Sequence, residues 1–449
     1  MILANMHRRV LGRNRSGGGN RAKPVAKRRD VLQSARRAAS LAIILLGGVI
    51  ALTAAPPARA ADAAFTAWLA QLWPEAQKMG ISRRGFDTAT RNLEPNLALP
   101  DLILPGKPDR EEPGQAEFVR TPAEYLSEKS LSRLAAYGRQ LEKDHAGTLA
   151  AIEKRFGVPA TMVLAIWGRE TDFGRYTLPH NALTALATQS YYGRRKEQFV
   201  GEFLYAIKMV DDGHIKPADF TGSWAGATGL TQFMPSEYYK YAVDLDGDGR
   251  ANIWGSVPDA LASAAKQLAG KGWQTGKRWA YEVRVPKKVD CTIAVPNQTM
   301  PLGEWLKRGY VPAFGRQPSA AERAEPHSLL LPAGIYGPAF LISKNYFVIK
   351  DYNFSDLYVL FVGSLHDRLT EGHGFETRWG TVAQLHTRDL EQMQRRMTEL
   401  GLYQEKIDGK AGMKTRAALG AYQKANNLKL DCWPSTAVLS HMRRKVGQK

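Results

Sequence analysis

The chain has 449 residues, of which 44% are hydrophobic and 23% are charged. At roughly 100 to 200 residues per domain, this length allows about two to four domains, and the composition excludes collagen-like, disordered and multi-span membrane proteins. The formal net charge is +19 at pH 7. Residues 1–60 hold twelve Lys and Arg against one acidic residue, so +11 of the charge lies there and +8 remains for the rest. This excess favours an anionic partner, and nucleic acid, a membrane surface and an acidic cell-wall polymer all qualify.

Residues 1–60 follow the order of a secretory signal. They are basic and rich in Gly and Ser over 1–37, uncharged and apolar over 38–55, and end in small residues on either side of Arg59. We expect cleavage after Ala60 and export to the periplasm. The export route stays open, because Arg-Arg pairs at 28–29 and 36–37 also fit a twin-arginine pathway, although neither has the full motif around it. The alternative is a single transmembrane anchor, because the apolar run is near the lower length limit for spanning. Since both cysteines lie far from the cleavage site, we do not expect a lipoprotein.

Helices are expected over most of the next 200 residues. Apolar residues recur at helical spacing through 61–155, apart from a Pro-rich stretch at 95–113. Residues 156–275 indicate several helices separated by Gly-rich turns. Residues 281–365 have a mixed pattern, in which short β-branched and aromatic runs such as 346–349 suggest small β elements.

The C-terminal part is predicted to be a separate small module. Residues 371–386 have the composition of a linker, and the helical pattern that follows occupies about sixty residues at 387–449. Cys291 and Cys432 are far apart and fall in different predicted domains. We therefore expect them to be small buried residues that do not pair with each other.

One predicted helix carries a carboxylate on its buried side. Residues 158–174 have Pro in the first turn and end at Gly, as helices do. Val163, Ile166, Trp167 and Glu170 share the stripe that faces the core. Burial against Trp167 would raise the pKa of Glu170 and keep it protonated near neutral pH, ready to donate a proton to a leaving oxygen. A structural glutamate bonded to buried backbone would give the same pattern, so both roles stay open.

A second segment combines small residues with a polar side chain. Residues 223–236 contain two glycines and several small residues before Gln232. Such a segment brings backbone close to a ligand and aims a polar group at it. A tight packing turn between helices would need the same glycines, so the pattern alone does not decide between the two interpretations.

Four blocks, taken together, carry a family resemblance. They are the segments 167–174, 226–236, 241–249 and 351–353. In sequence and order these blocks resemble the lytic murein transglycosylase B family of bacterial cell-wall enzymes. The resemblance implies a mainly α (α+β) fold over residues 61–370, with a lysozyme-like catalytic core, an added helical subdomain and small β elements.

The resemblance also implies an activity. Members of that family cut the β-1,4 bond between N-acetylmuramic acid (MurNAc) and N-acetylglucosamine (GlcNAc) in peptidoglycan. Glu170 would be the sole acid/base: it protonates the glycosidic oxygen and then takes a proton from the sugar's own C6 hydroxyl, which closes a 1,6-anhydro ring. An intramolecular nucleophile gains from effective molarity, so neither a second carboxylate nor a cofactor is required for the chemistry.

Further site residues are implied by the same resemblance. The expected sugar-groove residues are Ser223, Gln232, Tyr352, Asn353 and Tyr358, and the expected contacts to peptide or lactyl carboxylates are Arg194 and Arg195. The two tyrosines could instead be core aromatics, and the two arginines a solvated pair. At 266–267 this chain has Lys-Gln where the family commonly has Asn-Tyr, so a stacking aromatic is missing there.

The third block contains half of a calcium loop. Carboxylates stand at loop positions 1, 3 and 5, with a backbone carbonyl expected at position 7. Position 12 is Gly rather than Glu, and a later aspartate is expected to replace it. The predicted ligand set for structural Ca²⁺ is Asp244, Asp246, Asp248, Arg250 and Asp259. A metal-free Asp/Gly turn is the alternative.

The last sixty residues resemble a second family, the three-helix peptidoglycan-binding domain often appended to wall hydrolases. The order of helix, turn and helix over 388–423 carries this resemblance, and Cys432 stands where Gly is usual. It implies that residues 387–449 bind peptidoglycan, although a docking domain without a ligand would have the same core. We expect glycan strands and cell-wall machinery as partners of a monomer, with no nucleic acid. The alternatives are a non-catalytic wall-binding scaffold and a hydrolytic muramidase.

Overall fold

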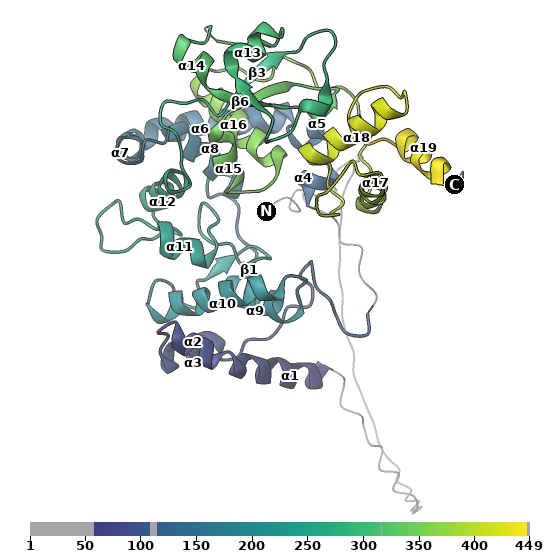
Figure 1. Cartoon of the computed structure of the whole chain (residues 1–449). Helices are drawn as coiled ribbons and strands as arrows, with labels where there is room; N and C mark the ends of the chain where they lie inside the picture. The colour runs from purple at the N-terminus through teal and green to yellow at the C-terminus, as the bar shows by residue number, and fades with distance from the viewer. Residues whose placement is uncertain (1–57, 108–114, 316, 447–449) are drawn as a thin grey trace, which may run out of the picture.

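The computed structural model describes residues 58–107, 115–315 and 317–446. The expected export segment 1–60 lies outside the described residues, except for 58–60, which begin the first helix. Figure 1 shows a lower helical lobe, an upper lobe that contains a sheet, and a C-terminal module on the flank of the upper lobe. Within the described ranges, no helix is long and apolar enough to cross a membrane.

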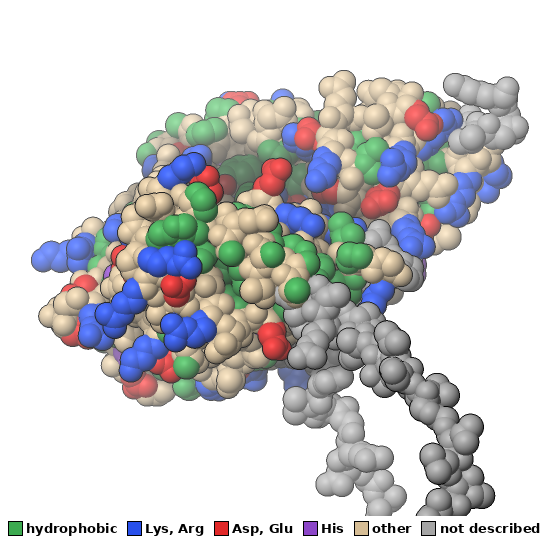
Figure 2. Space-filling view, turned by 90° about the horizontal axis from the view of Figure 1, so that it is seen from below, with side chains coloured by type: hydrophobic (Ala, Val, Ile, Leu, Met, Phe, Trp, Pro, Cys, Tyr) green, Lys and Arg blue, Asp and Glu red, His purple; other side chains and the backbone are tan. Residues whose placement is uncertain are grey.

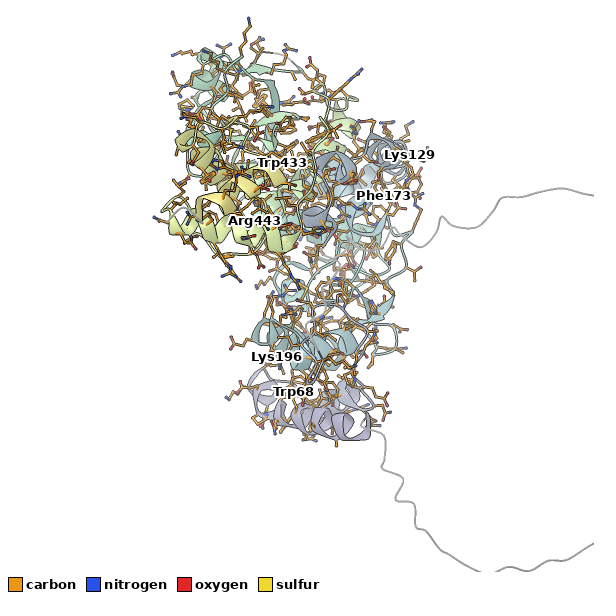
Figure 3. The ribbon with its side chains drawn as sticks, turned by 90° about the vertical axis from the view of Figure 1, so that its right-hand side faces the viewer. Trp68, Lys129, Phe173, Lys196, Trp433 and Arg443 are labelled. Atoms are coloured by element: carbon orange, nitrogen blue, oxygen red, sulfur yellow. A yellow bond between two sulfur atoms is a disulfide. The ribbon has the colours of Figure 1, made fainter. Side chains whose placement is uncertain are left out.

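The lower lobe is a layer of helices with its own core. Its helices are α1(Ala58–Gln71), α2(Trp73–Lys78), α3(Arg83–Thr90), α9(Ala182–Tyr192) and α10(Lys196–Asp211). Phe65 and Leu69 lie one turn apart on α1 and are buried against α9 and α10. Trp68 stacks on Phe203 of α10 at 6.4 Å between ring centroids, and Figure 3 shows it in this lobe. Asp211, at the end of α10, accepts the backbone N–H of Ser82 at 2.7 Å and so fixes the start of α3.

The upper lobe surrounds one buried helix. Its helices are α4(Ala116–Val119), α5(Pro122–Tyr125), α6(Glu128–Asp144), α7(Ala146–Phe156), α8(Ala160–Thr171), α12(Val257–Gly270), α15(Lys344–Lys350) and α16(Asp356–Thr370), while α11(Pro235–Tyr241) lies between the lobes, against α10 and α12. Ten of the twelve residues of α8 are buried, because α6, α7, α12 and α16 pack around it. A helix that is apolar on all sides must lie in the interior, and α8 has this character.

A five-stranded antiparallel sheet covers the top of the upper lobe, in the order β4-β6-β8-β3-β5. The strands are β3(Ala280–Arg284), β4(Thr299–Pro301), β5(Val311–Pro312), β6(Pro326–Leu330) and β8(Ala339–Ile342), with the short β7(Pro332–Ile335) outside the ladder. The helices α13(Leu302–Lys307) and α14(Ala320–Ala324) and the 3₁₀ turn η1(Cys291–Ile293) flank it. Trp305 is fully buried and donates its indole N–H to the carbonyl of His327 at 2.9 Å. A second, two-stranded pair joins β1(His180–Asn181) to β2(Thr221–Gly222).

Residues 346–349 form part of a helix, α15, and the suggested β element is wrong there. Ser343 caps α15 by accepting the N–H of Asn345 at 3.1 Å. Tyr346, Val348 and Ile349 are fully buried in the main core. A short apolar run has no period that separates a buried strand from a buried helix, and here the cap and the surrounding core select the helix.

The C-terminal module has three helices, α17(Thr387–Glu399), α18(Met413–Ala425) and α19(Thr436–Val446). Its core contains Leu390, Met393 and Met397, which recur at helical spacing on one side of α17. Residues 371–386 have no regular structure, yet they pack against the upper lobe. The N–H of Gly380 donates to the carbonyl of Tyr336 at 2.6 Å. Figure 3 shows Trp433 in the module, where its indole N–H donates to the carbonyl of Ala383 at 2.9 Å.

Cys291 and Cys432 form a disulfide, so the prediction that they stay unpaired is wrong. Their Cα atoms lie 6.1 Å apart although 141 residues separate them in the sequence. The pair forms because α18 packs against η1 and brings the turn after it onto the sheet side of the upper lobe. Cys432 has a φ of 53°, the left-handed conformation that explains why Gly is usual at this position. Sequence distance gave no sign of this contact.

Candidate functional site

Three distant chain segments meet around Glu170. The hydroxyl of Thr171 donates to the carbonyl of Leu230 at 2.7 Å, which joins the end of α8 to the Gly-rich segment. The hydroxyl of Tyr352 donates to the carbonyl of Thr231 at 2.6 Å. The hydroxyl of Tyr358, in the first turn of α16, donates to Oε1 of Glu170 at 2.6 Å. Three of the four blocks that carry the family resemblance, 167–174, 226–236 and 351–353, therefore meet at one site.

The end of α8 places Glu170 at the edge of the core. Asp172, Phe173 and Gly174 all have positive φ, so the chain turns back sharply after the helix. The ring of Phe173 then packs edge-on against Trp167, with 5.5 Å between centroids. A Cβ atom on Gly168 would come within 2.6 Å of that ring. Gly168 is required because the aromatic ring lies directly on the helix backbone.

The surroundings of Glu170 favour its protonated form. Only 7% of the residue is exposed, and this burial raises the pKa of its carboxyl group. The neighbouring Arg169 and the hydrogen bond from Tyr358 lower the pKa and partly offset the effect of burial. Burial also raises the pKa of Tyr358 well above its usual value, so the phenol stays protonated and remains a hydrogen-bond donor. The pair provides a carboxyl group that is held in place and whose protonated form is favoured by burial, as a general acid requires.

Arg169 is held among aromatic rings behind Glu170. Its guanidinium lies over the rings of Tyr125 and Phe361, in each case at 5.2 Å, and donates to the hydroxyl of Tyr125 at 2.6 Å. Glu117 is the nearby second carboxylate, buried and 5% exposed, and its charge raises the pKa of Glu170. Sequence analysis did not single out Arg169, Tyr125 or Glu117. Arg169 lies inside the matching block, but the other two carry no local signal, since packing alone brings them to the site.

The Gly-rich segment holds Gln232 in a constrained position. Gly226 and Gly229 have φ near 80°, and a Cβ atom on Gly229 would lie 2.8 Å from the carbonyl oxygen of Ile253. Gln232 itself has a φ of 56° and donates from Nε2 to the carbonyl of Gly229 at 3.0 Å. Its Oε1 is buried and lacks a hydrogen-bond partner among the described residues. A buried acceptor of this kind is suited to a ligand hydroxyl or N–H.

Ser223 occupies the interior of the same segment. It has no exposed surface, and its hydroxyl accepts the N–H groups of Ala225 at 3.3 Å and Ala227 at 3.2 Å. The expected contact between Ser223 and a sugar stays a prediction, and it would use the proton of this hydroxyl. The residue holds the loop that presents Gln232, because its hydroxyl is turned toward the loop backbone.

Tyr352 and Asn353 lie beside the carboxylate. The ring of Tyr352 is half-buried and nearly parallel to that of Tyr358, with 6.5 Å between centroids and 7° between planes. Asn353 accepts the N–H of Ser355 at 3.1 Å and so shapes the turn that leads into α16. Both residues lie next to Tyr358, the side chain that contacts Glu170, and their contact with a sugar stays a prediction.

Arg194 and Arg195 lie at the start of α10 and pair with a carboxylate of the protein itself. Both form ion pairs with Asp101, at 3.6 Å from Arg194 and 3.1 Å from Arg195. Arg195 also lies over the ring of Phe199 at 5.0 Å. A substrate carboxylate would have to compete with Asp101 for both cations.

Residues 266–267 are Lys-Gln where the family commonly has Asn-Tyr. The side chain of Gln267 is buried and donates from its amide to Glu237 at 2.7 Å. This residue is therefore a packed polar contact between two helices.

The acidic loop brings together three of its five expected ligands. Asp244, Asp246 and Asp259 offer carboxylate oxygens within 4.8 Å of one another. Asp259, in the first turn of α12, also accepts backbone N–H groups of the loop at 2.8 Å. The carboxylate of Asp248 accepts the N–H of Arg250 and does not belong to this convergent set, while the expected ligand of Arg250, its backbone carbonyl, stays a prediction. Three carboxylates so close repel one another without a cation, and hard oxygen donors suit Ca²⁺.

Comparison with known proteins places the chain among cell-wall proteins. The profile described as Transglycosylase SLT domain matches residues 64–367, and that of a peptidoglycan binding domain matches residues 387–442. The curated membrane-bound lytic murein transglycosylase B of Escherichia coli (strain K12) is 44% identical over 126 residues. That match covers 28% of this chain and 35% of the relative, so the chain matches about a third of the relative's length.

Two solved structures from Pseudomonas aeruginosa match over more of the chain. SltB3, solved in complex with NAG-anhNAM-pentapeptide, is 35% identical with a TM-score of 0.75, and the match covers 84% of this chain and 99% of that one. The soluble lytic transglycosylase SltB1 is 28% identical with a TM-score of 0.55, over 69% of this chain and 99% of that one. Both matches reach nearly the full length of the solved chains.

Proposed function

This chain belongs to the transglycosylase SLT domain family, and we propose that it is a lytic transglycosylase acting on the glycan strands of peptidoglycan. The reaction cuts the β-1,4 bond between MurNAc and GlcNAc and leaves a 1,6-anhydro end. One observation carries the proposal: the carboxyl group of Glu170 is nearly buried, has a raised pKa and receives a hydrogen bond from Tyr358. The SltB3 complex with NAG-anhNAM-pentapeptide supports the choice of substrate and product.

Glu170 acts as both acid and base in this proposal. It gives its proton to the glycosidic oxygen as the bond to C1 breaks, and the GlcNAc side leaves as a neutral alcohol. The resulting carboxylate then takes the proton of the C6 hydroxyl, whose oxygen bonds to C1 and closes the anhydro ring. Protons balance within one residue and no water is consumed, so a second carboxylate is not needed. Tyr358 holds the carboxyl group in place during both steps.

The remaining site residues have supporting roles. Gln232 accepts a hydrogen bond from the sugar through its Oε1, and Tyr352 and Asn353 form the adjacent part of the groove. Asp244, Asp246 and Asp259 hold a structural Ca²⁺ that takes no part in the chemistry. In this scheme residues 61–370 are catalytic, 371–386 connect, and 387–449 bind the polymer after export and removal of residues 1–60. Attachment of the module to insoluble polymer raises the local substrate concentration.

The test is mass spectrometry of the soluble products released from purified peptidoglycan. The protein lacking residues 1–60 is compared with the same protein carrying Glu170→Gln, which keeps the shape of the side chain but cannot transfer a proton. Glu94→Gln, at an exposed position outside the site, is the matched control. We expect anhydro-MurNAc products from the wild type and the control only. Products with reducing ends would instead establish a hydrolytic muramidase, and uncut polymer bound by all variants would establish a scaffold.

A further inference from the structure

A large pocket lies between the C-terminal module and the upper lobe. Its volume is about 610 Å³, within the range of about 300 to 1,000 Å³ typical of ligand sites. One wall comes from the segment around α4 and α5, and the other from the turn between α17 and α18. Figure 1 shows α4, α5 and α18 close together. The lining residues used below are Glu117, Phe118, Arg120, Phe354, Lys406 and Lys410.

The pocket adjoins the site around Glu170. Residues 354–357 line it and lead directly into Tyr358, whose hydroxyl bonds Glu170. Glu117 lines it as well and is close enough to raise the pKa of Glu170. Phe354 lies at its edge with 70% of its surface exposed, a large exposure for an apolar aromatic side chain. The pocket therefore lies next to the turn of α16 that carries Tyr358.

More Lys and Arg side chains than acidic side chains line the pocket, so the pocket carries excess positive charge. Lys350 and Arg416 both pair with Asp356, and Lys414 pairs with Glu405. By contrast, Arg120, Lys406 and Lys410 form no ion pair with any of the described residues. Lys410 lies 4.1 Å above the ring of Phe118, and burial lowers the pKa of its ammonium group, an effect that the charges of Asp408 and Glu117 in the same pocket partly offset.

One acceptor at the inner end of the pocket is also unused. Glu117 is 5% exposed, and its Oε2 has no hydrogen-bond partner within the described ranges. A buried carboxylate oxygen is costly without a donor. The pocket thus offers three cationic groups and one buried acceptor, a combination that suits a ligand with both carboxylates and N–H donors. A neutral sugar would leave the cationic groups unmatched.

We propose that this pocket binds the peptide stem of the glycan strand, with the stem carboxylates at Arg120, Lys406 and Lys410 and a stem N–H at Glu117. The proposal rests on the proposed function, since the stem branches from MurNAc, the sugar whose C1 reacts at Glu170. The pocket's position beside Glu170 fits this branching point. The C-terminal module then contributes two of the cations that select the substrate, in addition to attaching the enzyme to the polymer.

The test compares two substrates made from the same polymer: peptide-bearing glycan strands and strands stripped of peptide by an amidase. The variant Arg120→Gln/Lys406→Gln removes two of the cations, and Lys410 is left in place because it packs on Phe118. The matched control is Lys216→Gln/Lys287→Gln, which removes the same charge at exposed positions outside the pocket. The measured quantity is the ratio of kcat/KM on peptide-bearing strands to kcat/KM on stripped strands.

We expect this ratio to fall about tenfold in the pocket variant and to stay at the wild-type value in the control. A fall of kcat/KM by the same factor on both substrates would overturn the proposal in favour of glycan binding, and an unchanged ratio would also overturn it. Calorimetry with the tetrapeptide released by the amidase gives a second measurement: binding to the wild type, weakened in the pocket variant, is expected. If the wild type formed no anhydro ends on either substrate, the proposed function would fail, while the peptide binding could still be measured.

Discussion

The disulfide between Cys291 and Cys432 joins the module covalently to the upper lobe, and its removal is a quantitative test of that connection. Cys432→Ser removes the bond and leaves a similar side chain. Cys432→Gly removes it too, but relieves the cost of a positive φ at this position, where the structure has 53°. Comparison of the two variants separates the contribution of the bond from that of the backbone.

The expected magnitude follows from the length of chain that the bond closes. Residues 141 positions apart are linked, and the chain-entropy relation for a loop of that size gives about 5 kcal/mol, an upper estimate. The left-handed conformation costs a residue with a side chain about 1 kcal/mol or more relative to Gly. We therefore expect Cys432→Ser to lower the free energy of unfolding by up to about 5 kcal/mol, and Cys432→Gly to lower it by about 1 kcal/mol less.

Urea unfolding with and without a reductant measures these differences. The wild type should lose stability on reduction, whereas both variants should be unaffected by the reductant. Titration of thiols in the denatured, unreduced wild type should find none free. Two free thiols, or equal unfolding midpoints for oxidised wild type and Cys432→Ser, would contradict the reasoning. A stable disulfide is expected only in an oxidising compartment, so the same result bears on the proposed export to the periplasm.

Three further predictions concern protons and metal. Tyr358→Phe removes a hydrogen bond that lowers the pKa of Glu170, so the pKa should rise. The alkaline limb of the pH profile of kcat/KM should then move to higher pH, and kcat should fall. An alkaline limb at the wild-type pH would contradict this prediction. Burial raises the pKa of Asp367 to about 7. The contribution of this carboxyl group to the stability of the folded protein is therefore complete below about pH 4 and is lost as the pH rises through about 7. The total loss is about 4 kcal/mol. Asp367→Asn cannot ionise and should become increasingly stable relative to the wild type between pH 5 and pH 8 in urea unfolding; a constant difference would refute the assignment. Added Ca²⁺ should raise the Tm of the wild type, because at a hundredfold excess over its Kd it adds about 2.7 kcal/mol to the free energy of unfolding. Asp246→Asn should reduce that rise. A Tm that changes with neither Ca²⁺ nor a chelator would contradict the metal site.

Local patterns in the sequence predicted the helix that carries Glu170, because its buried stripe and its terminal Gly are encoded by neighbouring residues. The structure gives α8 at Ala160–Thr171 inside the predicted segment 158–174, with Trp167 and Glu170 buried as expected. The Gly-rich segment was also recognisable, since Gly229 and Gln232 need conformations that few residues adopt. These features depend on short-range chemistry, which a sequence shows directly.

Features that depend on distant packing were missed or misread. The run 346–349 is helical because a buried core surrounds it. Glu117 reaches the site from the short helix α4, although fifty-three positions separate it from Glu170 and no pattern links the two. Each of these facts needs three-dimensional contacts that periodicity does not contain.

The contacts of Asp356 indicate that the module is part of the structure that holds the reacting carboxyl group. Burial alone would raise the pKa of Asp356, but Lys350 and Arg416 hold it well below its usual value. Arg416 belongs to the module and lies 3.1 Å from the carboxylate, with 8% of each side chain exposed. Removing one partner of such a buried pair costs about 3 to 5 kcal/mol, and loss of the module would also expose Met413, which packs in the main core. Because Asp356 lies two residues before Tyr358 in the same helical turn, a catalytic domain cut off at residue 386 would lose a support of the Tyr358–Glu170 contact.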